Sequence, residues 1–142
     1  MSLFNKVLAS IGVGAATVDT KLHKSSYTIN EKVTGVVEVT GGNMEQQIDA
    51  IYLTLYTSFV REVDDRKVND QAALQNFQIN EPFIIQANEK REIPFSFTLP
   101  TTVPVTAGKS RVWIHTGLDI KNAVDPKDTD YIDVQPTRLA SA

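Results

Sequence analysis

The sequence predicts an all-β protein, built as an antiparallel β-sandwich with a short N-terminal helix. Ile93, Phe95, Phe97 and Leu99 fall on one face of a strand, because side chains in a strand alternate between two faces. This period of two recurs from residue 16 to residue 134. No helical stretch is long enough to supply the crossovers of a parallel sheet. A length of 142 residues fits one such domain.

The first element is the expected helix, over residues 3–11, with Ser2 as its cap and Gly12 and Gly14 ending it. Its apolar stripe would pack on the sheet, pair with a second copy or contact a membrane; the stripe comprises Leu3, Phe4, Val7, Leu8 and Ile11. Membrane-surface helices carry several basic residues, and this segment has only Lys6, so packing or self-association is preferred.

Three strands are expected next, over residues 16–23, 33–39 and 48–60. A turn at Asn30-Glu31 separates the first two, and the Gly41-Gly42-Asn43 loop precedes the third. In the third strand Tyr52 and Tyr56 share the face opposite the apolar one.

The second half is expected to alternate between strands and longer loops. The charged residues 62–71 show no period and predict a solvated loop. Residues 74–85 predict a weaker strand, bent or at an edge because of Pro82. The strand at 93–99 and an extended crossing to Gly108 precede a strand at 112–120. An Asp-rich loop over 122–130 then leads to Ile132 and Val134.

Composition and motifs argue against several classes of function. The chain has no cysteine, which excludes disulfides and is compatible with the cytoplasm, where we expect the protein. A net charge of −3 argues against a nucleic-acid surface. His23 and His115 are the only histidines, and neither a nucleophile-elbow sequence nor a glycine-rich phosphate loop is found. We therefore expect no enzyme activity, catalytic residue, metal site or cofactor.

An alternative function is suggested by the acidic residues between Asp119 and Asp133. Calcium takes six to eight oxygen ligands, and sandwich loops can supply them, as in C2-like calcium- or lipid-binding modules. The spacing matches no calcium-loop pattern, so a solvated acidic loop is preferred.

Outward aromatic side chains predict an interaction surface. By alternation Trp113, Tyr52 and Tyr56 leave the core face, and large aromatics often anchor protein contacts. The alternative is that these rings belong to the core or lie under the N-terminal helix. The run from Asp70 to Gln75 has few charges and predicts an open sheet edge, which can accept a strand from a partner.

Several strings resemble a known family. Residues 18–22 and 31–37 (VDTKL and EKVTGVV) resemble the opening hairpin of arrestin-like N-terminal domains, and residues 93–100 and 112–120 resemble their central and closing strands. The start, MSLF with GVGAATVDT at 12–20, resembles the bacterial sporulation-control (stage-zero M) proteins. The resemblance implies an immunoglobulin-like arrestin sandwich and a non-enzymatic regulator or scaffold, usually with two lobes in tandem.

The expected organisation has three parts: residues 1–14 as helix and glycine-rich link, 15–136 as one arrestin-like lobe, and 137–142 as a linker. The expected function is regulation through protein partners, with self-association into a dimer or larger homo-oligomer. The residues expected to make these contacts are Trp113, Tyr52, Tyr56, Leu3, Phe4 and Val7.

Overall fold

The computed structural model of the chain describes residues 14–104, 106 and 110–136, and these contain nine strands and no helix. The strands are β1 (Thr17–Leu22), β2 (Ser26–Thr28), β3 (Lys32–Thr40), β4 (Gln46–Val63), β5 (Arg66–Gln78), β6 (Phe83–Ile85), β7 (Lys90–Thr98), β8 (Arg111–Ile120) and β9 (Lys127–Gln135).

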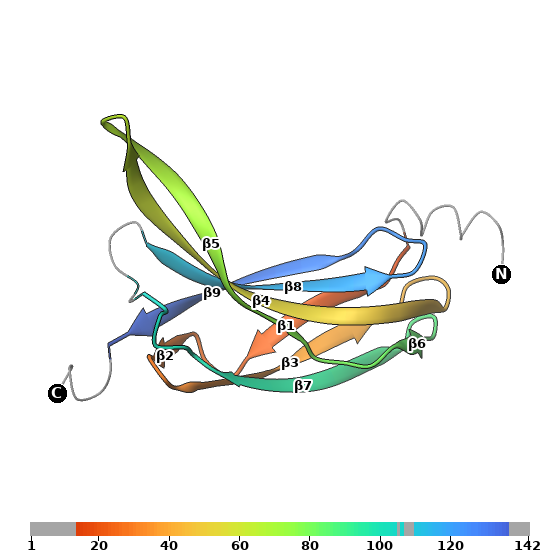
Figure 1. Cartoon of the computed structure of the whole chain (residues 1–142). Coiled ribbons are helices and arrows are strands. Elements are labelled where there is room, and N and C mark those ends of the chain that lie inside the picture. Colours follow the sequence, from red (N-terminus) through yellow and green to blue (C-terminus); the bar gives the residue numbers. More distant parts are fainter. Residues whose placement is uncertain (1–13, 105, 107–109, 137–142) are drawn as a thin grey trace.

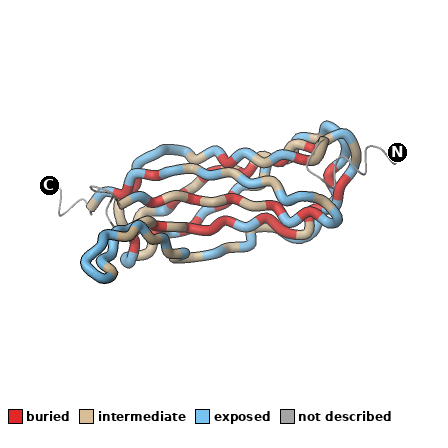
Figure 2. The backbone as a smooth tube through the Cα atoms, turned by 90° about the horizontal axis from the view of Figure 1, so that it is seen from above, coloured by how far each residue is buried: buried red, intermediate tan, exposed pale blue. Residues whose placement is uncertain are grey.

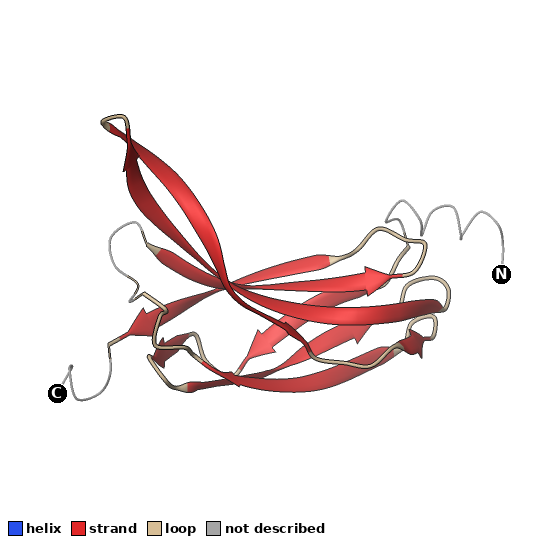
Figure 3. Ribbon diagram, in the orientation of Figure 1, coloured by secondary structure: helices blue, strands red, loops and turns tan. Residues whose placement is uncertain are grey.

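The strands form two sheets stacked face to face (Figure 1, Figure 3). The smaller sheet has the order β1-β3-β7, and the larger has the order β2-β9-β8-β4-β5, with β6 also paired to β4. The pairings are antiparallel apart from the short parallel pair of β2 and β9. The predicted all-β sandwich is therefore confirmed.

The core lies between the sheets and follows the predicted alternation. In β3 every second residue from Val33 to Val39 is buried, and in β8 the same holds from Val112 to Ile120. Figure 2 shows buried and exposed positions alternating along the strands. Because most of the inward side chains are apolar, their removal from water stabilises the stack of two sheets.

The prediction of a solvated loop over residues 62–71 is wrong. β4 and β5 form one long hairpin, in which Val63 pairs with Arg66. The connecting residues Asp64 and Asp65 both have positive φ, 51° and 63°, which is the conformation of a two-residue type I′ turn. Aspartate tolerates this conformation better than most residues, so the local sequence suits the turn.

The hairpin projects beyond the sandwich as an arm (Figure 1). We call residues 58–71 the arm. β4 has 18 residues, about 60 Å of extended chain, whereas β3 and β7 have nine each. No described strand covers either face of the arm, so Phe59 and Val60 are exposed. An extra residue in β5, Leu74, forms a bulge close to the base of the arm, and bulges bend strands.

The weaker strand expected over 74–85 is divided between two strands in the structure. β5 ends at Gln78, and β6 resumes only after Pro82, at Phe83. Both strands lie on the same side of β4, so Pro82 falls in the break between them at the sheet edge.

The loop expected over 122–130 is shorter than predicted, because β9 begins at Lys127. On β9, Asp128 and Asp130 face the smaller sheet, on the same side of the strand as the buried residues Ile132 and Val134. Polar residues at inward positions hide the alternation in the sequence, which explains the error.

Two further expectations concern the ends of the chain. The helix over 3–11, with Leu3, Phe4 and Val7, and the linker over 137–142 lie outside the described residues. In the part of the chain that the structure describes, no helix is long and apolar enough to span a membrane.

Candidate interaction surface on the larger sheet

A row of three aromatic side chains crosses the outer face of the larger sheet. Tyr56 on β4 pairs with Trp113 on β8, and Trp113 pairs with Tyr131 on β9. The Tyr56 and Trp113 rings stack with centroids 5.6 Å apart, and the Trp113 and Tyr131 centroids are 5.7 Å apart. Tyr131 is 62% exposed, and the other two rings are half-buried. The row therefore offers a continuous aromatic surface to solvent.

Sequence reasoning placed Trp113 and Tyr56 on this face but missed Tyr131. The acidic loop expected over 122–130 ends directly before Tyr131, so this residue falls at the boundary between the expected loop and the strand that follows. The alternation of Tyr131, Ile132, Asp133 and Val134 was the available signal, since it places Tyr131 opposite the two buried aliphatic residues.

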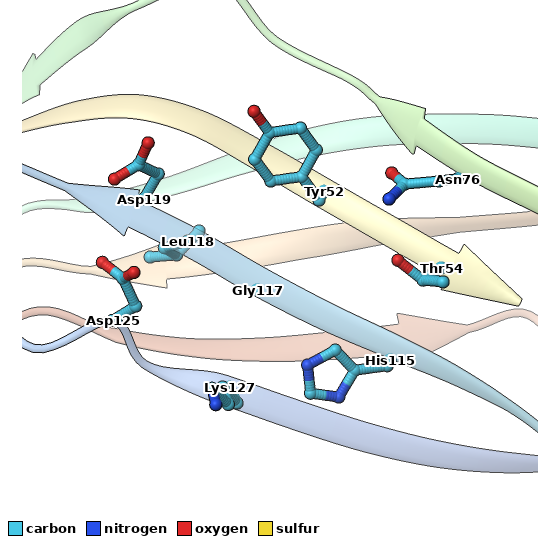
Figure 4. Close-up of a pocket in the computed structure, with 9 residues that line it drawn as sticks. All are labelled: Tyr52, Thr54, Asn76, His115, Gly117, Leu118, Asp119, Asp125 and Lys127. Atoms are coloured by element: carbon cyan, nitrogen blue, oxygen red, sulfur yellow. The ribbon is translucent and has the colours of Figure 1, made fainter. Parts of the chain in front are cut away.

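Beside the row lies a shallow hollow of about 360 Å³, shown in Figure 4. Gly117 on β8 lies opposite Tyr52 on β4 and Lys127 on β9, so its missing side chain leaves the hollow open. Tyr52, predicted as an interaction residue, is 39% exposed and forms one wall. The lining consists of Tyr52, Thr54, Asn76, His115, Gly117, Leu118, Asp119, Asp125 and Lys127.

Charged groups of both signs line this hollow. Asp125 accepts a hydrogen bond from the Ile120 N–H through Oδ1, at 3.0 Å. Among the described residues, Asp119, Asp125 and Lys127 form no ion pair. The His115 ring meets the Tyr56 ring edge-on, with centroids 6.2 Å apart, and so joins the hollow to the aromatic row.

The outer side of β5 is an open sheet edge. In the described part of the chain β5 pairs with β4 alone. The Ile79 N–H donates to the Ile51 carbonyl, so these two residues form a hydrogen-bonded pair. The same kind of pair recurs at every second residue along the two segments. Because the bonds alternate along an antiparallel pair, the N–H groups of Asn76 and Gln78 point away from β4, towards the open side. The predicted edge at Asp70–Gln75 is confirmed as part of β5.

A polar seam closes the opposite side of the sandwich, where β1 approaches β8 and β9. The Thr20 N–H donates to Asp128 Oδ2 at 2.7 Å, and the Thr20 and Thr116 hydroxyls lie 2.6 Å apart. Burial, a hydrogen bond with Asp128 and the charges of Asp128 and Asp19 raise the pKa of Asp130 to about 7. Asp130 Oδ2 is buried without a protein donor, which fits a carboxyl that retains its proton.

The acidic residues considered as a calcium loop are thus divided between different places. Asp119 and Asp125 line the outer hollow, whereas Asp128 and Asp130 face inward at the seam. Within the described ranges no three His, Cys, Asp or Glu side chains are placed to hold a metal ion together.

His23, the other histidine of the chain, forms a hydrogen bond with a neighbouring strand. His23 Nδ1 lies 2.5 Å from the Thr34 hydroxyl on the neighbouring strand β3.

Comparisons with known proteins agree with one another. The family model described as SpoOM protein matches residues 4–142. Sporulation-control protein spo0M of Bacillus subtilis (strain 168) is 43% identical over 135 residues, which cover 95% of this chain and 52% of that protein. The chain therefore spans about half the length of this relative.

Solved structures give the same family and a wider fold similarity. The crystal structure of Spo0M from Bacillus subtilis superposes with a TM-score of 0.83 and 41% identity, over 87% of this chain and 50% of that one. The Pseudomonas fluorescens alkylpurine DNA glycosylase AlkC, bound to DNA containing an abasic site analog, has a TM-score of 0.55 and 9% identity, over 92% of this chain and 33% of that one. At that identity the likeness shows the fold alone.

Proposed function

The chain belongs to the SpoOM protein family, and from that premise we propose that it is a non-enzymatic regulatory or scaffold protein of sporulation control. It acts by binding proteins, including a second copy of itself. The sporulation role rests on the name of its Bacillus subtilis relative. The proposed location is the cytoplasm, with which a cysteine-free sequence is compatible.

The open edge of β5 is the observation that carries the proposal. An edge strand presents unpaired N–H and C=O groups, and a strand from another molecule can complete them. Natural proteins usually protect such edges with charges, prolines or covering segments. The stretch from Gln71 to Gln78 contains no charged residue and no proline.

The aromatic row supports the same proposal. It lies on the same sheet as β5, because Tyr56 pairs with Ala73 on one side and with Trp113 on the other. Half-buried Tyr and Trp side chains supply large contact areas at little entropic cost. A partner strand added at β5 would extend the sheet, and its neighbouring side chains would reach the row.

Sedimentation velocity with a matched pair of variants tests the proposal. Asn76→Pro removes the N–H that points to the open side, while the β4 side of the ladder is kept. Asn76→Ala removes the same side chain but keeps the N–H. We expect self-association that rises with concentration, weakened at least about fivefold by proline and little changed by alanine.

Two results would contradict the proposal. The first is that the wild-type chain sediments as a monomer at every protein concentration measured. The other is equal association of the proline and alanine variants, with both folded by thermal melting.

A further inference from the structure

The hollow beside the aromatic row has a glycine at its centre that the fold does not require. Gly117 has an ordinary φ, and a Cβ added there would come no closer than 3.9 Å to another group, the His115 Nε2 atom. Glycine inside a strand is destabilising relative to alanine, because glycine loses more conformational freedom when the chain folds. Where no bulge or backbone contact explains it, a strand glycine often marks a place where a ligand approaches.

The walls of the hollow suit a flat cation. Figure 4 shows Asp119 and Asp125 at one end, with Tyr52 on one side and His115 and Lys127 on the other. Tyr52 offers a ring that is 39% exposed, and such a ring attracts a cation over its face. Asp119 is exposed and Asp125 uses only Oδ1 within the protein, so carboxylate oxygens remain for a guest.

The charges favour a cationic guest over an anionic one. Two carboxylates outnumber the single ammonium, that of Lys127, among the lining residues. A guanidinium can stack on an aromatic ring and donate to a carboxylate at the same time, because it is planar and carries five donors. The ammonium of lysine is compact and strongly hydrated, and it matches this combination less well.

We propose that the hollow over Gly117 binds an arginine side chain of a protein partner. The proposal rests on the proposed protein-binding function and specifies the chemistry of one contact. The guanidinium lies over Gly117, against the Tyr52 ring, and donates to Asp119 and Asp125. The adjoining row of Tyr56, Trp113 and Tyr131 then contacts apolar residues that flank the arginine.

Titration with N-acetyl-arginine amide, followed by two-dimensional NMR of backbone amides, tests this site directly. We expect saturable shifts centred on Gly117, Asp119 and Lys127, with a dissociation constant in the millimolar range. N-acetyl-citrulline amide is the neutral isostere and should bind at least about fivefold more weakly.

Variants of the chain supply matched controls. Gly117→Val fills the hollow and should abolish binding, while the melting temperature stays equal or rises. Asp119→Asn should weaken binding several-fold, and Lys127→Ala should strengthen it. Asp133→Asn removes the same charge from an exposed position of β9 outside the hollow, and it should leave binding unchanged.

The proposal is overturned if arginine amide produces no saturable shift, if citrulline amide binds equally well, or if Asp119→Asn and Asp133→Asn behave alike. Asp119→Asn keeps the test decisive if Gly117→Val does not fold. None of these results changes the sedimentation test at β5, so failure of the hollow and failure of the protein-binding function are distinguishable.

Discussion

Burial at the seam between the sheets gives Asp130 a pKa of about 7, against an ordinary value of 3.8. The carboxyl is partly withdrawn from water, and Asp128 and Asp19 oppose its ionisation. Between about pH 4 and pH 7 the folded protein therefore holds a proton that the unfolded chain has released. Stability falls as the pH rises through this window, and the whole cost is present above pH 7.

Asp130→Asn removes this cost while keeping a group that can donate to Asp128. We expect the variant to be more stable than the wild type at about pH 8, on the order of 1 kcal/mol, because the carboxyl is partly exposed and its interactions are screened. At about pH 4 the gain should vanish. Chemical denaturation at the two pH values measures this difference, with Asp133→Asn as the control for the loss of one exposed charge.

Destabilisation by Asp130→Asn at the higher pH would contradict this account of the seam, as would an equal gain at both pH values.

Alternation in the sequence placed Trp113, Tyr52 and Tyr56 on the outer face, because the face on which a side chain lies depends only on neighbouring positions. The environment of Asp130 could not be predicted in this way, since it depends on β1, more than a hundred residues earlier in the chain.

At the scale of elements, strands with one buried face could be predicted from the sequence, whereas strands exposed to solvent on both faces could not. β3, β7 and β8 carry mostly apolar residues at every second position, so their existence followed from the pattern. The arm has polar residues on both faces because no second sheet covers it, and its strands therefore resemble a loop in sequence. β2 has only three residues, too few to show a period.

The aromatic row joins three strands, and Trp113 at its centre is the residue to test. Trp113→Ala removes two ring contacts, each worth about 0.5–1.5 kcal/mol, so we expect a loss of about 1–2 kcal/mol in the free energy of unfolding. Ile114→Ala, at the neighbouring buried position, should cost more, about 2–5 kcal/mol. Equilibrium denaturation of both variants makes the comparison.

The same Trp113 variant should also weaken self-association in sedimentation, because the row is proposed as part of the contact surface. A Trp113→Ala variant that unfolds, or that loses more stability than Ile114→Ala, would show that the ring belongs to the core. Unchanged association with the fold intact would remove the row from the proposed contact.

At the scale of the whole molecule, the sandwich was predictable but the order of its strands was not. The alternation of apolar residues predicts which side chains face inward, but it does not predict which strands are neighbours in a sheet. The hollow depends on that order, because Tyr52, Gly117 and Lys127 meet only when β4, β8 and β9 are neighbours. The open edge at β5 was predictable in part, since the Asp70–Gln75 run lacks most of the charges that usually protect an edge.

Amide hydrogen exchange along β5, compared between dilute and concentrated protein, tests the central proposal most directly. If a second copy pairs at this edge, the outward amides of Asn76 and Gln78 become protected as concentration rises, while amides that already bond to β4 change little. Association without new protection at Asn76 and Gln78 would show that the molecules meet elsewhere, and the role proposed for the β5 edge would be wrong.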